Sequence, residues 1–169
     1  MGATEHKESA ESQVARCAIF TVSDSKTKET DVSGKLAFEI LSKYGQDVVD
    51  LRVVKNDQKA ITAAVAGAVG GVADLVVTVG GTGVSKNDLT IDAVRGLIVK
   101  ELPGFGELFR SMSAKEIGTA TIMSRALLGV TEQRKLVVAL PGSPAAVKLG
   151  LKDILVNELK HLLWELRKS

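Results

Sequence analysis

Hydrophobic residues in this chain alternate between short continuous runs and segments where they recur every three or four positions. Short runs rich in β-branched residues are typical of buried strands, and the wider spacing is typical of amphipathic helices. In the first half of the chain this pattern predicts three strands and three helices in alternation. The strands are expected at 14–23, 48–54 and 75–79, with helices that begin at Ser33, at Asn56-Asp57 and at Ile91, the last ending at Val99.

The second half is less regular. Residues 102–106 interrupt the pattern, and residues 107–110 predict the start of a short helix. Residues 117–125 mix small, polar and apolar side chains and predict no element with clarity. Two further apolar runs, 127–131 and 135–140, flank a polar turn, which predicts a hairpin with one antiparallel member.

The last helix has clear boundary signals. Ser143 can act as its N-cap and Pro144 fits the first helical position, where a missing N–H costs nothing. Apolar residues at helical spacing then continue to about Leu166. Together, these elements predict an α/β fold with a mostly parallel, doubly wound sheet. Residues 14–169 are expected to form a single domain, preceded by a disordered tail at 1–13.

Composition excludes several classes of function. The net charge of +2 is too small to favour binding of nucleic acid or of a membrane surface, and no apolar run approaches the roughly 18 residues of a membrane span. Cys17 is the single cysteine, so no intramolecular disulfide can form, and a cytoplasmic location is expected. Because Cys17 falls in the first strand, it is interpreted as a packed thiol. The two histidines, His6 and His161, are too few and too far from the core for a histidine-based site.

The most informative stretch follows the third strand. Gly80-Gly81-Thr82-Gly83 is a turn that can expose bare backbone N–H groups to a ligand. It is followed by Asp88 and Thr90 at the start of the next helix. A strand, a glycine turn and a helix start are typical of the place where open α/β sheets hold phosphorylated ligands. The spacing matches neither the G-x-G-x-x-G dinucleotide pattern nor the P-loop, so the stretch predicts an unspecified anion site.

Four loops are expected to meet at one edge of the sheet, because the carboxyl ends of parallel strands point the same way. They are Ser23-Asp24, Asn56-Asp57, Gly80 to Asp88, and Pro141-Gly142-Ser143. Such a crevice would gather three carboxylates and a glycine turn, which suits a phosphorylated substrate with Mg²⁺.

Each polar residue of this crevice also has a purely structural interpretation. Asp57 stands where a helix N-cap would stand, and Asp24 can shape a turn. Thr90 and Ser143 can both act as caps. Asp88 has less of a structural reason to be present, because Thr90 could cap the same helix.

These residues resemble a known family. Thr78 to Gly83 followed by Asn87 to Thr90 is similar to the T-x-G-G-T-G signature, with its downstream aspartate and threonine, of the MogA/MoaB-type molybdenum cofactor biosynthesis proteins. Further matches lie at 103–110, at 140–144 and at 113–125, the last of which resembles the MoaB branch. Ile91 and Asp92 stand where the signature has proline and glutamate, and Asn87 replaces its arginine or glycine.

The resemblance implies a three-layer α/β/α sandwich that assembles as a homotrimer or homohexamer. It implies adenylylation of molybdopterin by MgATP, with release of pyrophosphate. Asp57 and Asp88 fall on the two catalytic aspartates, and both are hypothesised to act through Mg²⁺. The residues implied to contact nucleotide, phosphate or pterin are Ser23, Asp24, Gly80, Gly81, Thr82, Gly83, Thr90, Ser111, Ser113, Pro141, Gly142 and Ser143.

The alternative is a protein of the same pathway that binds molybdopterin, or acts as a scaffold, without catalysis. ATP and molybdopterin are the expected substrates, and a molybdate-inserting enzyme is a candidate partner.

Overall fold

A computed structural model describes residues 13–168. All six strands belong to one sheet in the order β2-β1-β3-β6-β5-β4. β1 (Arg16–Val22), β2 (Asp47–Val54), β3 (Leu75–Val79) and β6 (Leu136–Leu140) are mutually parallel, and β5 (Leu127–Thr131) runs antiparallel to β6 and to the edge strand β4 (Ile98–Glu101). The expected mostly parallel sheet with one antiparallel strand is confirmed.

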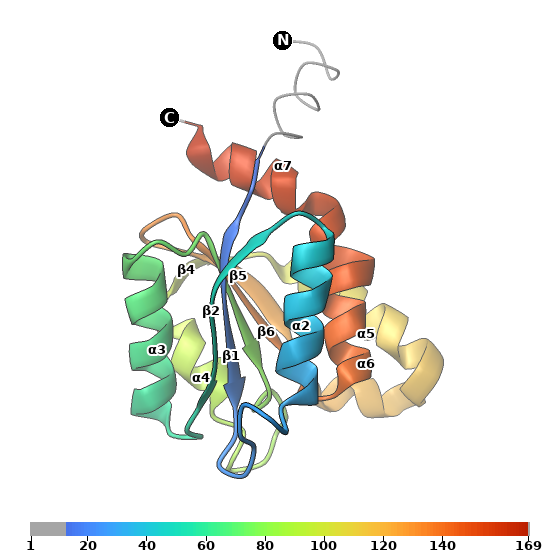
Figure 1. Cartoon of the computed structure of the whole chain (residues 1–169). Helices are drawn as coiled ribbons and strands as arrows, with labels where there is room; N and C mark the ends of the chain where they lie inside the picture. Colours follow the sequence, from blue (N-terminus) through green and yellow to red (C-terminus); the bar gives the residue numbers. More distant parts are fainter. Residues whose placement is uncertain (1–12, 169) are drawn as a thin grey trace.

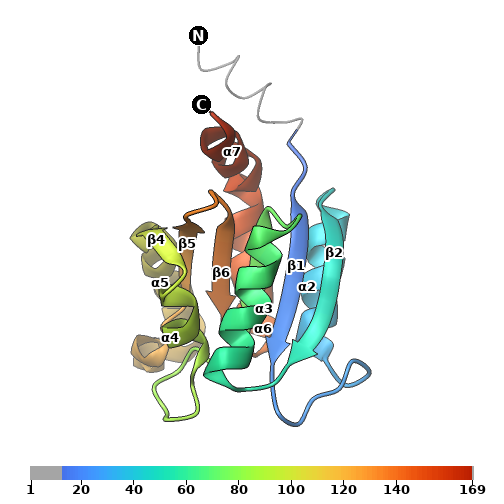
Figure 2. The same ribbon diagram turned by 90° about the vertical axis from the view of Figure 1, so that its left-hand side faces the viewer.

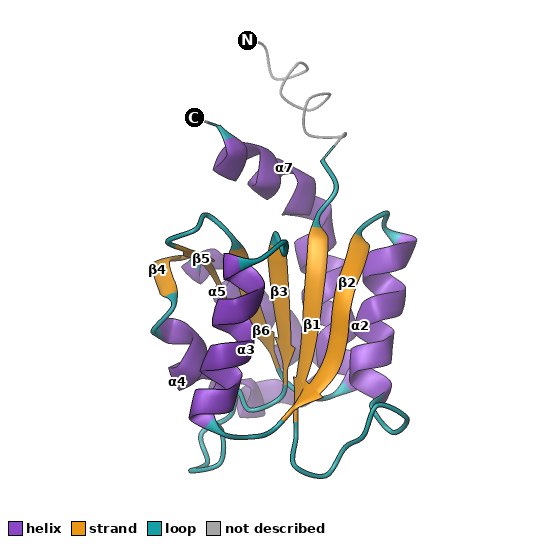
Figure 3. Cartoon of the chain, turned by 60° about the vertical axis from the view of Figure 1, so that its left-hand side comes forward, coloured by secondary structure: helices purple, strands orange, loops and turns teal. Residues whose placement is uncertain are grey.

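Helices cover both faces of the sheet, so the predicted three-layer sandwich is confirmed (Figures 1 and 3). One face packs against α3 (Gln58–Gly70) and α4 (Thr90–Arg95). The other packs against α2 (Val32–Lys43), α5 (Pro103–Ile117) and a C-terminal helical segment. That segment consists of α6 (Pro144–Val147), the π-helical η2 (Lys148–Leu155) and α7 (Val156–Arg167). Figure 2 shows both helix layers with the strands between them.

Central strands are buried on both faces, which explains their continuous apolar runs. Every residue of β3, β5 and β6 is buried. Cys17 lies in this core, as predicted, and burial, followed by the charges of Asp74 and Asp47, raises the pKa of its thiol to about 12. The thiol therefore stays protonated at neutral pH. Within residues 13–168, no helix combines the length and apolar character that crossing a bilayer requires.

Three local predictions were wrong. Residues 98 and 99 were assigned to a helix, but Gly96 ends α4 and Ile98 pairs with Thr131 in the sheet, so strand pairing prevails over local helical spacing. The helix expected from residue 107 begins at Pro103 and continues to Ile117. Asp31, not Ser33, caps α2 by accepting a hydrogen bond from the Gly34 N–H at 2.9 Å. The tail predicted at 1–13 lies outside the described residues, except for Gln13.

A buried carboxylate joins the strands at the edge of the sheet opposite the four predicted loops. Asp74, directly before β3, is 4% exposed and accepts hydrogen bonds from the backbone and side chain of Arg16 and from Lys135. Arg167 of α7 forms a third ion pair with it at 3.4 Å. Burial by itself would raise the pKa of Asp74, but the hydrogen bonds and the charge of Lys135 lower it to about 2.

Asp74→Asn is expected to destabilise the fold by about 2 kcal/mol at neutral pH, because the low pKa reflects stabilisation of the charged form by its partners. The folded pKa lies below the ordinary value, so this contribution is present above about pH 4 and is lost as pH falls towards 2. Urea unfolding from pH 7 to pH 2 measures it. Asp50→Asn, which removes an exposed ion pair with Arg52, should cost less than about 0.5 kcal/mol. Equal acid sensitivity of wild type and Asp74→Asn would contradict the assignment.

Candidate functional site

The four predicted loops meet at the carboxyl edge of the parallel strands, at the bottom of Figure 1. The Asn56 N–H donates to Asp24 Oδ1 at 3.1 Å, and the Asn56 side-chain amide donates to the Asn87 carbonyl at 3.0 Å. A Cβ placed on Gly142 would lie 3.5 Å from the Gly80 Cα, so these two loops are also in close contact. The predicted convergence is therefore confirmed.

The glycine turn has a shape that other residues adopt with difficulty. Gly80 and Gly81 have φ values of +99° and +71°, in the left-handed region. Thr90 stabilises the turn through two hydrogen bonds. Its hydroxyl donates to the Gly80 carbonyl at 2.7 Å, and its N–H donates to the Gly81 carbonyl at 3.0 Å. Thr90 thus shapes the turn and is not the cap of α4, whose N-cap Leu89 makes no side-chain cap.

Asp88 is held within its own loop. Its Oδ2 accepts the Ser85 N–H at 2.8 Å. A Cβ on Gly83 would lie 2.7 Å from the same oxygen, so glycine at that position leaves room for the carboxylate. Partial burial raises the pKa of Asp88, but hydrogen bonds from Ser85 and Gly83 and the charge of Arg125 outweigh this effect and leave the pKa below its usual value. Asp88 is therefore ionised at neutral pH.

Asp57 acts as a cap, as its structural interpretation predicts. Its Oδ2 accepts the Ala60 N–H at 2.9 Å at the start of α3. The residue is exposed, so the cap does not hide the carboxylate from a ligand. Asn56, next to it, contributes a further feature: its Oδ1 is buried and has no hydrogen-bond partner in the described part of the chain. Buried acceptors without a partner are uncommon in native proteins.

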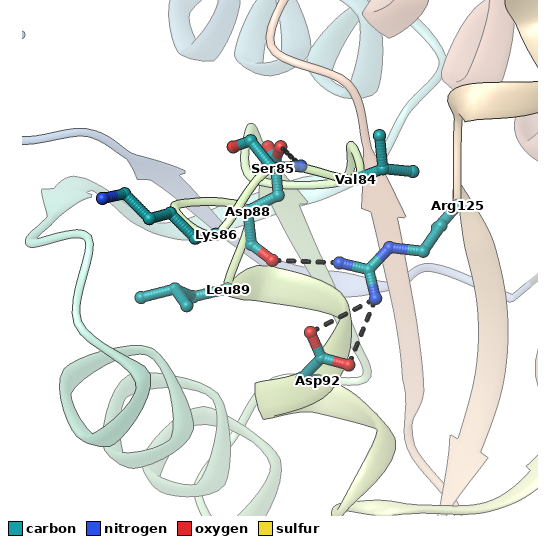
Figure 4. Close-up of a pocket in the computed structure, with 7 residues that line it drawn as sticks. All are labelled: Val84, Ser85, Lys86, Asp88, Leu89, Asp92 and Arg125. Atoms are coloured by element: carbon teal, nitrogen blue, oxygen red, sulfur yellow. Dashed lines mark hydrogen bonds and ion pairs between the residues drawn. The ribbon is translucent and has the colours of Figure 1, made fainter.

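A pocket of about 350 Å³ opens beside Asp88, between the glycine loop and the segment before β5 (Figure 4). Its lining residues are Val84, Ser85, Lys86, Asp88, Leu89, Asp92 and Arg125. In Figure 4 the Lys86 side chain extends away from Arg125. The contribution of Arg125 was missed at the sequence level, because residues 117–125 predicted no element.

Some of the other candidate residues lie at the four loops, and two lie apart from them in α5. Ser23 accepts the Lys26 N–H at 3.1 Å, and Asp24 connects its loop with that of Asn56. Both residues therefore lie where the four loops meet. Ser143 caps the C-terminal helical segment by accepting the Ala146 N–H at 3.2 Å, as predicted. Ser111 and Ser113 lie within α5, and in the described structure no hydrogen bond connects either of them with the four loops.

Asp57 and Asp88 could each contribute a carboxylate oxygen to a hard cation that is shared with a ligand. Asp57 and Asp88 each have one oxygen fixed by a backbone N–H, and carboxylate oxygens suit Mg²⁺. Within residues 13–168, no group of three acidic, histidine or cysteine side chains is close enough to hold a metal by itself. A Mg²⁺ ion at these aspartates would accordingly depend on oxygens from a phosphate ligand and water, as is usual for this ion.

The fold and the loops together define a doubly wound α/β protein with a glycine turn at the carboxyl edge of its parallel strands. Comparisons with known proteins identify its family. Residues 18–161 match the family described as "Probable molybdopterin binding domain". A crystal structure of molybdenum cofactor biosynthesis protein B is 43% identical, with a TM-score of 0.89, and the match covers 93% of this chain and 98% of that one.

Two further relatives support the same family. Molybdenum cofactor biosynthesis protein B of Bacillus cereus is 45% identical over the full length of both chains. The tungsten cofactor synthesizing protein MoaB of Pyrococcus furiosus is 39% identical, with a TM-score of 0.84, and the match covers 92% of this chain and 99% of that one. The chain belongs to the molybdenum cofactor biosynthesis family of molybdopterin-binding domains, as the sequence motifs indicated.

Proposed function

We propose that this protein adenylylates molybdopterin, using MgATP and releasing pyrophosphate. The observation that carries the proposal is the hydrogen bond from Asn56 to the Asn87 carbonyl, which joins the loops of Asp57 and Asp88 beside the glycine turn. The names of the relatives support the pathway, and the two aspartates on hydrogen-bonded loops favour a nucleotidyltransferase within it.

The chemistry requires little general base catalysis. The terminal phosphate of molybdopterin is already anionic at pH 7, and one of its oxygens attacks the α-phosphorus of ATP. A new phosphoanhydride bond forms as the bond between the α- and β-phosphates breaks, and pyrophosphate leaves. The main difficulty is the approach of two anions, which the backbone N–H groups of Gly81 and Thr82 would ease by hydrogen bonding to phosphate oxygens. Those of Gly80 and Gly83 already donate within the protein, to the Leu140 carbonyl at 2.8 Å and to the Asp88 carboxylate. Mg²⁺ held by Asp57 and Asp88 would supply further neutralisation of charge on the phosphates.

Incubation of the protein with molybdopterin, ATP and Mg²⁺ is expected to yield pyrophosphate and adenylylated molybdopterin in equal amounts. The product is identified by mass spectrometry and pyrophosphate by a coupled assay. Chelation of Mg²⁺ should stop both, because the phosphate charges would then be insufficiently neutralised. Molybdopterin binding without either product would contradict the enzymatic proposal and favour the scaffold alternative.

Assembly and location form part of the same proposal. Exposed apolar side chains gather on α5 and on the following 3₁₀ segment η1 (Gly118–Met123): Leu108, Ile117, Ile122 and Met123. Such a group on a single chain supports burial between copies, in a homotrimer or homohexamer. We place the protein in the cytoplasm, with a molybdate-inserting enzyme as the recipient of its product. Light scattering of the purified protein tests the assembly.

A further inference from the structure

Arg125 contacts the loop of Asp88 at several points at once. Its Nε donates to the Gly83 carbonyl at 2.8 Å, and one terminal nitrogen donates to the Asp88 carbonyl at 2.9 Å. The other terminal nitrogen lies 3.1 and 3.2 Å from the two carboxylate oxygens of Asp92. The backbone N–H of Arg125 also donates to the Thr82 carbonyl at 2.9 Å. One residue thus connects the start, the end and the following helix of this loop, and Figure 4 shows its contacts with Asp88 and Asp92.

The loop has few other supports along its length. Residues 84–87 are exposed. Its internal bonds are those between Ser85 and Asp88, the one from the Gly83 N–H to the Asp88 carboxylate, and a weaker one from the Asn87 N–H to the Ser85 hydroxyl at 3.2 Å. From outside the loop, the Asn56 amide donates to the Asn87 carbonyl at 3.0 Å. The Gly83 and Asp88 carbonyls, which accept hydrogen bonds from the guanidinium, lie on either side of this exposed stretch. Fixing both carbonyls limits how the backbone between them can rearrange, and so limits where the Asp88 carboxylate points.

Topology explains how a residue so distant in sequence reaches the loop. β5 is antiparallel, so its beginning lies at the same edge of the sheet as the ends of the parallel strands. Leu127 pairs with Ala139, one residue from the end of β6. Arg125, two positions before Leu127, is therefore placed at the candidate site by the direction of β5.

We propose that Arg125 is a positioning residue that holds the loop from Gly83 to Asp88 in the shape needed to present Asp88 to a phosphate ligand. The role in catalysis rests on the proposed function, whereas the role in loop shape does not. The geometry of the guanidinium is the essential feature, because lysine keeps the charge but cannot donate in three directions from a planar group. The ion pair with Asp92 contributes less to holding the loop, because the Asp92 side chain is 55% exposed.

Amide hydrogen exchange of the free protein tests the loop directly. Arg125→Lys is expected to speed exchange at least about 10-fold at Ser85, Asp88 and Thr90, whose N–H groups are bonded within this segment. Amides of β3 should exchange as in wild type. Arg95→Lys is the matched control, because Arg95 lies on α4 in an exposed ion pair with Glu101. Unchanged exchange at the three loop amides, or equal acceleration in β3, would overturn the proposal.

Steady-state kinetics then test whether the shape of this loop affects catalysis. Arg125→Lys is expected to lower kcat about 10- to 100-fold while KM for MgATP changes less than about 3-fold, since a small displacement of Asp88 affects the transition state most. Arg95→Lys should match wild type in both constants. If wild type itself forms no product, the proposed function fails while the exchange result still decides the loop. Faster loop exchange with an unchanged kcat would overturn the positioning role.

Discussion

Asp88→Asn is expected to lower the rate of adenylylation at least about 100-fold at ordinary Mg²⁺ concentrations. Asparagine has nearly the same shape and can still accept the Ser85 N–H, so the loop should stay folded. What is lost is the negative charge, which the low pKa of Asp88 keeps in place at neutral pH. A neutral amide holds Mg²⁺ far less well than a carboxylate, and losses of transition-state charge stabilisation of this kind cost factors of about 10² to 10³. Initial rates of pyrophosphate release over a range of Mg²⁺ concentrations measure the effect.

Two controls separate loss of charge from loss of structure. Asp50→Asn makes the same chemical change on β2, in an exposed ion pair outside the four loops, and should leave the rate unchanged. Excess Mg²⁺ should restore part of the rate of Asp88→Asn if its defect is weak metal binding. Near-normal turnover of Asp88→Asn at ordinary Mg²⁺ would show that Asp88 does not act through the metal.

Local sequence signals predicted the fold well wherever burial decides the structure. β3, β5 and β6 are buried at every position, and their apolar runs were correctly recognised as strands. The edge strand β4 was missed because only Ile98 of its four residues is partly buried. Its pairing with β5 depends on a partner about 30 residues away, which no local window can contain. Likewise, Ser33 resembles a cap in sequence, but its hydroxyl donates to the Gly142 carbonyl at 2.7 Å.

The candidate site shows the same division between local and distant information. The glycine turn and the capping role of Asp57 are local and were predictable from the residues alone. Arg125 is 37 residues from Asp88, in a segment without periodicity, and its contacts go mostly to backbone carbonyls, which carry no side-chain signal. One indication was available: the predicted hairpin implied an antiparallel strand starting at Leu127. An arginine just before such a strand must lie at the edge where the parallel strands end.

Gly81→Ala is expected to destabilise the protein by about 2 to 4 kcal/mol and to distort the candidate site. Alanine at a φ of +71° is strained by roughly 1 to 2 kcal/mol. Its Cβ would also lie 2.3 Å from the Thr90 hydroxyl, which would have to move and lose its hydrogen bond to the Gly80 carbonyl, at about 1 kcal/mol. Thermal and urea unfolding measure the loss of stability, and ATP binding by calorimetry measures the damage to the turn.

Gly67→Ala provides the matched comparison, because the same methyl group is added where neither obstacle exists. Gly67 lies within α3, has no positive φ, and a Cβ there would meet nothing within 4 Å. This change should therefore stabilise the protein by about 0.5 to 1 kcal/mol, since alanine favours a helix interior. Adding Thr90→Ala to Gly81→Ala removes the closest contact and leaves the backbone strain, so the double variant should recover only part of the loss. If Gly81→Ala were as stable as wild type and bound ATP equally well, the left-handed turn would not be what holds Thr90 and the nucleotide phosphates in place.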